Sequence, residues 1–175
     1  MAETAIIVPV DPAEKIVGGW RREHTPSGSK GMQAHVTLLA PFTPPERLAA
    51  ERMREVRDVL VDFQPFEFEL RRAAYLDLGS RRVLYLQPEP AQPFVDLISA
   101  LVSRFPAHPP YGDPDLKPLP HLTVATSSDD ALLAQIEKAV QRELPISAKA
   151  TEGWIVEYGQ QGCRIRSRIR LNGAP

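Results

Sequence analysis

The sequence predicts an α+β fold of two lobes related by a pseudo-twofold axis. Segments of alternating apolar and polar residues, typical of half-buried strands, are interspersed with segments whose apolar residues recur every three or four positions, typical of helices packed on one face. The order of these segments in residues 5–78 is repeated in residues 82–158, which indicates an internal duplication. We therefore expect each lobe to hold an antiparallel sheet with helices on its outer face.

The first repeat begins with a strand over residues 5–10 and a helix over residues 12–20. Residues 21–34 contain proline, glycine and serine without periodicity, so we expect an exposed and mobile loop there. An apolar strand follows at residues 35–40, and Pro41 ends it.

The longest helix is expected next, because apolar residues recur at spacings of four, three, four and three. These residues are Ala49, Met53, Val56, Leu60 and Phe63. Alternation of phenylalanine and leucine with charged residues then predicts a strand over residues 66–71, and residues 82–86 predict another. The first lobe thus reads strand, helix, loop, strand, helix, strand.

The second repeat follows the same order. After the strand over residues 82–86 comes a helical stripe, formed by Phe94, Leu97, Ile98, Leu101, Val102 and Phe105. After the proline-rich loop 106–120, residues 121–125 predict a strand. A second stripe predicts a helix through Leu133, Ile136, Val140 and Leu144. The chain closes with a strand over residues 146–158, in which Gly153 marks an irregularity, and a C-terminal strand over residues 164–171.

Length and composition fit one domain spanning residues 1–175, formed by two intertwined lobes. The 21 basic and 22 acidic residues leave a net charge of −1, which argues against a protein that coats long nucleic acids by bulk electrostatics. The single cysteine, Cys163, excludes an intrachain disulfide and fits a reducing cytoplasm. No stretch approaches the roughly 18 apolar residues that a membrane helix needs, and the N-terminus lacks the pattern of a secretory signal. We expect a cytoplasmic monomer without membrane contact.

Each repeat contains one His-x-Thr motif, His35-x-Thr37 and His121-x-Thr123, at the start of an apolar strand. Side chains alternate along a strand, so His35 and Thr37 share one face while Val36 lies on the other. The apolar face must pack against the helices. Both motifs should therefore point away from the helical layer, and a pseudo-twofold axis would bring them together across one cleft.

Two facing histidines beside two hydroxyl donors suit phosphoryl transfer. One neutral imidazole can take a proton from the attacking oxygen and one imidazolium can give a proton to the leaving oxygen, because the ordinary pKa of histidine lies near neutrality. The threonine hydroxyls can donate to the non-bridging phosphate oxygens. This chemistry requires no metal, and the histidines show no His-x₃-His spacing, so we expect neither a metal site nor another cofactor.

Two His-x-Thr motifs in a chain of this length resemble the 2H phosphoesterase superfamily, specifically its bacterial group of 2′-5′ RNA ligases and RNA cyclic phosphodiesterases. The segments HVTLLAPF, RRVLYLQPEP and PPYGDPDLKPLPHLTVA are similar to that group in order and spacing, and the resemblance covers nearly the whole chain. It implies a bilobal α+β fold with His35, Thr37, His121 and Thr123 as the catalytic set. It also implies hydrolysis of 2′,3′-cyclic phosphates, usually to a 2′-phosphate, with the first histidine activating the nucleophile and the second protonating the leaving group.

Aromatic and basic residues near the motifs are candidate substrate contacts. Phe42, Tyr85 and Tyr111 lie just after or between the motif segments, where a ring could stack on a base or simply pack in the core or a loop. The C-terminal strand alternates four arginines with apolar residues. If its apolar side meets the helices, Arg166 and Arg168 look toward the cleft and could steer a nucleotide phosphate. A solvated sheet face with neighbouring acids is the alternative.

We therefore expect a metal-independent phosphodiesterase that hydrolyses the 2′,3′-cyclic phosphate ends of RNA or small nucleotides. Reversible 2′-5′ joining of RNA is an alternative, because the same two histidines can serve both directions of a phosphoryl transfer. A non-catalytic protein that binds RNA ends or nucleotides is a further alternative. Binding alone does not need a matched acid and base, which counts against this last interpretation.

Overall fold

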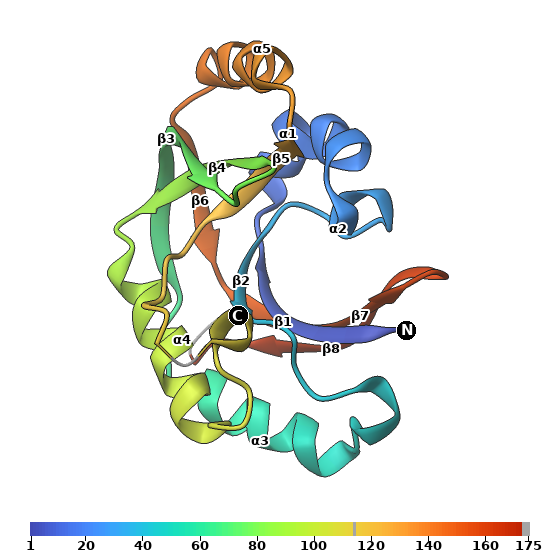
Figure 1. Ribbon diagram of the computed structural model, residues 1–175. Coiled ribbons are helices and arrows are strands. Elements are labelled where there is room, and N and C mark those ends of the chain that lie inside the picture. The colour runs from blue at the N-terminus through green and yellow to red at the C-terminus, as the bar shows by residue number, and fades with distance from the viewer. Residues whose placement is uncertain (114, 173–175) are drawn as a thin grey trace.

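The protein is built on two four-stranded antiparallel sheets with helices packed on them (Figure 1). The structure is a computed structural model that describes residues 1–113 and 115–172. The first sheet has the order β2-β1-β7-β8 and the second sheet the order β5-β4-β3-β6. The first sheet consists of β1 (Glu3–Pro9), β2 (His35–Leu39), β7 (Glu152–Gly159) and β8 (Gly162–Arg170). The second sheet consists of β3 (Phe66–Asp77), β4 (Arg82–Glu89), β5 (Leu122–Ser127) and β6 (Ile146–Ala150).

The helices lie in two groups at opposite ends of the molecule (Figure 1). Helices α1 and α5 pack on the second sheet, and α3 and α4 pack on the first. The helices are α1 (Asp11–His24), α2 (Pro26–Ser29), α3 (Ala50–Leu60), α4 (Gln92–Arg104) and α5 (Asp130–Gln141), with short 3₁₀ turns η1 (Pro45–Arg47) and η2 (Pro110–Gly112). Among the described residues, no helix is long and apolar enough to cross a membrane.

Each sheet combines strands from both halves of the chain. Strand β3 from the first half pairs with β4 and β6 in the second sheet, while β7 from the second half pairs with β1 in the first sheet. Helix α1 likewise follows a strand of the first sheet but packs on β5 and β6 of the second. The predicted fold class, a bilobal α+β arrangement of two antiparallel sheets covered by helices, is confirmed.

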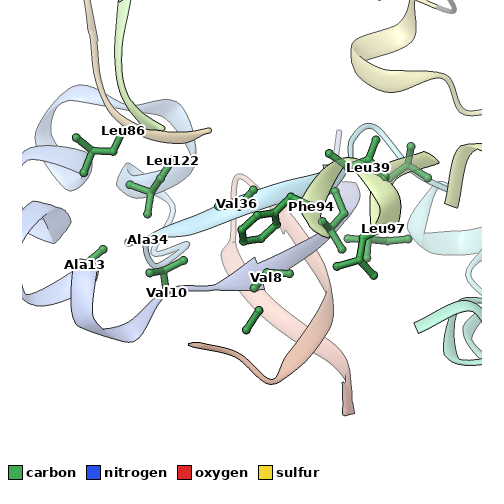
Figure 2. Packing of buried hydrophobic residues seen from close by; sticks show 14 of the residues in the cluster. Val8, Val10, Ala13, Ala34, Val36, Leu39, Leu86, Phe94, Leu97 and Leu122 are labelled. Carbon is green, nitrogen blue, oxygen red and sulfur yellow. The ribbon is translucent and has the colours of Figure 1, made fainter. Parts of the chain in front are cut away.

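One continuous apolar core joins the two sheets to their helices. Figure 2 shows Val8 and Val36 of the first sheet directed toward Phe94 of α4, and Leu86 and Leu122 of the second sheet in the same cluster. All five side chains are almost fully buried. Burial of a large apolar side chain contributes about 1.5–3 kcal/mol, so this cluster is a principal source of stability for both sheets.

The expected mobile loop over residues 21–34 is wrong. Helix α1 continues to His24, and α2 follows after Thr25, whose hydroxyl donates to the carbonyl of Arg21 at 2.8 Å and accepts the N–H of Gly28 at 2.9 Å. Arg21, Gly28 and Ala34 are buried. The segment lacks apolar periodicity because its buried residues include the polar Arg21 and Thr25, which bind main-chain carbonyls.

Two other predicted elements have different bounds. Helix α3 has 11 residues, three fewer than α1, and ends before Phe63. The strand predicted over residues 146–158 is two strands in different sheets, because the chain passes from β6 to β7 at Thr151. Gly153, next to this passage, lies against the fully buried side chain of Leu60 from α3.

Replacement of Gly153 by alanine should destabilise this junction. A Cβ atom at Gly153 would lie 2.8 Å from Cδ1 of Leu60, so the packed leucine must shift. We expect Gly153→Ala to lower the free energy of unfolding by about 1–3 kcal/mol, the usual cost of overpacking a core. Denaturation in urea measures this change.

Gly19→Ala is the matched control, because Gly19 is exposed on α1 and a Cβ there meets nothing closer than Arg22 Nη2 at 4.0 Å. It should raise stability by up to about 1 kcal/mol through helix propensity. Equal losses in the two variants would show that packing against Leu60 is not the cause.

Candidate active site

The two histidine motifs meet where the two sheets adjoin. Strands β2 and β5 are edge strands of their sheets, and they lie against each other. His35 is the first residue of β2, and His121 directly precedes β5. The two imidazoles are close enough that charge on His121 contributes to lowering the pKa of His35.

Both motif strands turn their threonine away from the main core. Thr37 pairs with Ile7 across the first sheet, and Thr123 pairs with Tyr85 across the second. The intervening Val36 is fully buried in the core cluster, as is its counterpart in the second motif. The faces predicted from strand alternation are therefore the faces observed.

A β-bulge follows the threonine in both motifs. The pairing register slips at Leu38 in β2 and at Val124 in β5, so each of these residues is extra relative to the partner strand. The bulge lets two consecutive apolar residues enter the core, Leu38 with Leu39 and Val124 with Ala125. Such bulges redirect side chains beside functional sites. Their matched positions give the two motifs the same local geometry.

Both imidazoles are held in the same way by the chain just before them. Nδ1–H of His35 donates to the carbonyl of Gln33 at 2.7 Å, and Nδ1–H of His121 donates to the carbonyl of Leu119 at 2.7 Å. Each acceptor lies two residues before its histidine. With Nδ1 engaged, Nε2 of each ring is the nitrogen left to exchange a proton.

The two histidines nevertheless have different surroundings. His35 is 8% exposed, and Arg21 Nη2 lies 3.5 Å from its Nδ1. Burial, and after it the charge of Arg21, lowers the pKa of His35. His121 lies between Tyr85, edge-on at 5.4 Å between ring centroids, and Tyr111, stacked at 5.9 Å. Burial also lowers the pKa of His121, but no guanidinium is among the causes.

Arg21 is the residue near the site that sequence reasoning missed. It is 1% exposed, and its Nη1 donates to the carbonyl of Thr123 in the second motif. Burial lowers its pKa to about 10, so it stays charged at neutral pH. A usable signal was present: Arg21 follows the buried Ala13 and Val17 at intervals of four, which places it on the buried face of α1.

The predicted aromatic contacts have different placements. Phe42 is 4% exposed and packs against Phe105 and His108, with centroids 5.1 and 5.2 Å away. This placement does not fit the substrate contact predicted for Phe42. Tyr85 is buried beside His121, whereas Tyr111 is 51% exposed and adopts a positive φ of 52°. Of the three predicted aromatic residues, Tyr111 alone offers an open ring surface next to a motif histidine.

The four arginines of β8 do not share one face, because a register slip in β7·β8 intervenes. Arg166 turns to Glu157, with Nη1 to Oε2 at 2.5 Å, and Arg164 binds the same carboxylate. The guanidinium of Arg168 lies over the Trp154 ring, 4.7 Å from its centroid.

Arg168 lies on the same sheet face as the first motif. Thr37 pairs with Ile7, Ile7 with Trp154, and Trp154 with Arg168, so the four residues form one row across the sheet. Register partners share a face. Of the two arginines predicted as phosphate contacts, Arg168 thus lies on the face of Thr37, whereas Arg166 is held in an ion pair.

No metal centre is formed by the residues that the structure describes. Within 1–113 and 115–172, no group of three or more histidine, cysteine, aspartate or glutamate side chains could hold an ion.

This fold and site define a class of α+β protein that has two antiparallel sheets, each with one His-x-Thr strand, joined at these edge strands. Residues 9–162 match the family model of the 2′-5′ RNA ligase superfamily. The chain therefore belongs to this superfamily, which confirms its resemblance to the 2H phosphoesterases.

Solved structures support the same fold. The protein TT0787 of Thermus thermophilus is similar with a TM-score of 0.65 at 16% identity, covering 99% of this chain and 100% of that chain. Escherichia coli LigT complexed with 3′-AMP is similar with a TM-score of 0.58 at 17% identity, covering 98% of each chain. No curated protein sequence matches significantly. At these identities, the structural similarity establishes the fold.

The buried neutral His35 should make stability depend on pH. Its folded pKa is lowered, whereas in the unfolded chain it is about 6.5, so below pH 6.5 the unfolded chain binds more protons. This group then reduces the free energy of unfolding by up to about 1.4 kcal/mol per pH unit as the pH falls. We expect His35→Asn, which can still donate to Gln33, to lose less stability than the wild type between pH 7 and pH 5.

Urea denaturation at both pH values measures this difference. His24→Asn is the control, because His24 at the end of α1 contacts Trp20 and Glu23. An unchanged pH dependence in His35→Asn would contradict the placement of a neutral imidazole at His35.

Proposed function

We propose that this protein is a metal-independent phosphodiesterase that hydrolyses the 2′,3′-cyclic phosphate ends of RNA or small nucleotides. Membership in the superfamily supports an enzyme of the phosphoesterase or RNA ligase type. The observation that carries the finer proposal is the matched anchoring of His35 and His121 through Nδ1, which leaves two Nε2 atoms for proton transfer. E. coli LigT, which shares the fold, has been crystallised with 3′-AMP.

In the proposed reaction, water attacks the phosphorus atom and the bond from phosphorus to O3′ breaks. His35 Nε2 takes the proton from the attacking water, and protonated His121 Nε2 gives its proton to the departing O3′. The products are a 2′-phosphate and a free 3′-hydroxyl. Thr37 and Thr123 donate hydrogen bonds to the non-bridging oxygens, whose charge grows in the transition state.

Two side chains that lie beside the motifs would contact the substrate. Tyr111 offers an exposed ring beside His121 for stacking on a base. Arg168 offers its guanidinium to a phosphate on the face of Thr37. Tyr85 orients His121 from a buried position, and Arg166 reaches a substrate only by leaving Glu157. The partners would be RNA ends or small cyclic nucleotides, and we expect the 1–175 domain to act as a cytoplasmic monomer.

Reversible 2′-5′ joining of RNA remains the second candidate, since the superfamily carries that name. In ligation, a ribose hydroxyl replaces water as the group that His35 deprotonates. Incubation of a cyclic-phosphate RNA end with a second RNA distinguishes the two reactions, because hydrolysis gives a monophosphate end and ligation gives a longer strand. Binding without turnover by the intact wild type would favour a non-catalytic nucleotide-binding protein.

Loss of either motif histidine should abolish most turnover. We expect His35→Ala and His121→Ala each to lower kcat on a 2′,3′-cyclic nucleotide by about 10² or more, the usual contribution of a general acid or base. The double variant should lose less than the product of the single losses, because the two groups act in one step.

His24→Ala is the control and should keep full activity, because the contacts of His24 are with Trp20 and Glu23. Near wild-type turnover in both single variants, on mononucleotide and oligonucleotide cyclic phosphates, would reject the assignment of this histidine pair.

Activity should depend on pH but not on divalent metal. A neutral base and a protonated acid give a bell-shaped kcat/KM profile whose apparent pKa values belong to the coupled pair. The pKa of each histidine is lowered, so the maximum should lie on the acidic side of neutrality. Full activity should persist after exhaustive EDTA treatment.

Activity that disappears with chelation and returns with one divalent ion would instead make His35 and His121 metal ligands. Measurements of kcat/KM across the acidic and basic sides of neutrality, with and without EDTA, test both expectations.

A further inference from the structure

The buried charge of Arg21 is not explained by stability. A guanidinium in the protein interior loses several kcal/mol of hydration, and an apolar residue in its place is often neutral or stabilising. Glu14, the acid whose charge acts on Arg21, is engaged elsewhere: Oε1 binds Arg22 Nη1 at 3.1 Å, and Oε2 accepts the N–H of Ala34 at 2.6 Å. Arg21 Nε has no hydrogen-bond partner among the described residues.

The contacts of Arg21 join the two motifs. Nη2 lies 3.3 Å from Ser27 Oγ and 3.4 Å from the carbonyl of Met32, both in the segment that leads into the first motif. Nη1 binds the carbonyl of Thr123 in the second motif. A planar guanidinium with fixed donor directions thus sets the distance between the segment before β2 and strand β5.

Arg21 is also the cation that faces His35. The charged and titratable groups around this imidazole are Arg21 from α1 and His121 beside β5, with Glu14 behind Arg21. A positive charge 3.5 Å from Nδ1 disfavours a second positive charge on the ring. His121 is flanked by Tyr85 and Tyr111 instead, and no cation contributes to lowering its pKa.

We infer that Arg21 is a positioning residue that holds the two motifs at their working distance and keeps His35 neutral, so that His35 serves as the base and His121 as the acid. This inference rests on the proposed function. Arg21 need not touch the substrate, because it acts on the backbone of the second motif and on the imidazole of the first.

Two substitutions separate the two parts of this role. Arg21→Met removes the charge while keeping the length of the side chain, and Arg21→Lys keeps a cation but loses the planar fork. Arg22→Met is the matched control, because the side chain of the neighbouring Arg22 is 62% exposed and binds Glu14. For each variant, nuclear magnetic resonance gives the pKa of His35, and kcat/KM against pH is measured with a 2′,3′-cyclic nucleotide.

In Arg21→Met, the pKa of His35 and the acidic limb of kcat/KM should both rise by about one pH unit or more, because a nearby like charge is gone. In Arg21→Lys, the limb should stay near its wild-type position while kcat falls about tenfold or more, because Thr123 is no longer held. Arg22→Met should change neither. A purely structural role would lower stability without moving the acidic limb.

The outcomes distinguish this inference from the proposed function. Absence of turnover by the wild type on every cyclic phosphate would reject the proposed function, although His35 could still titrate below His121. An active wild type whose acidic limb is unchanged in Arg21→Met would overturn the role of Arg21. If the methionine variant does not fold, titration of the wild type decides, because a pKa of His35 above that of His121 would overturn the assignment of base and acid.

Discussion

The contact between edge strands β2 and β5 is the constraint on which the site depends. Each strand must bury one face in the shared core, so its other face is free for histidine and threonine. Because the two strands meet, the polar residues of both motifs gather at one junction. The core thus does more than stabilise the sheets: it determines on which side of the junction the two motif histidines lie.

The two motifs have the same backbone geometry but different neighbouring side chains. The bulges and the Nδ1 hydrogen bonds are matched in the two motifs. The neighbours are not matched, since a guanidinium lies beside His35 and two phenol rings flank His121. Acid–base catalysis of a phosphoryl transfer needs two groups in opposite protonation states. The proposed reaction takes this difference from the unlike surroundings of the two motifs.

The sequence predicted the fold class and the faces of both motifs because strand alternation and helical spacing are local properties. It did not reveal the burial of Arg21, because that burial depends on oxygen atoms from Ser27, Met32 and Thr123 that only the fold assembles. The prediction that the arginines of β8 share one face is wrong for a related reason. A register slip is set by the partner strand β7, and alternation along β8 alone cannot show it.

The exchange of β3 and β7 between the sheets has a consequence for how the protein folds. Neither half of the chain contains all the strands of either sheet, so each half alone leaves unpaired edges that a second chain could occupy. Many of the stabilising pairings therefore join residues far apart in sequence, and such long-range pairing slows folding. During synthesis, the first half must wait for β7 to leave the ribosome before its own sheet can close. If each half had once been a separate chain, strands β1, β2 and β7 could have met only in a strand-swapped dimer.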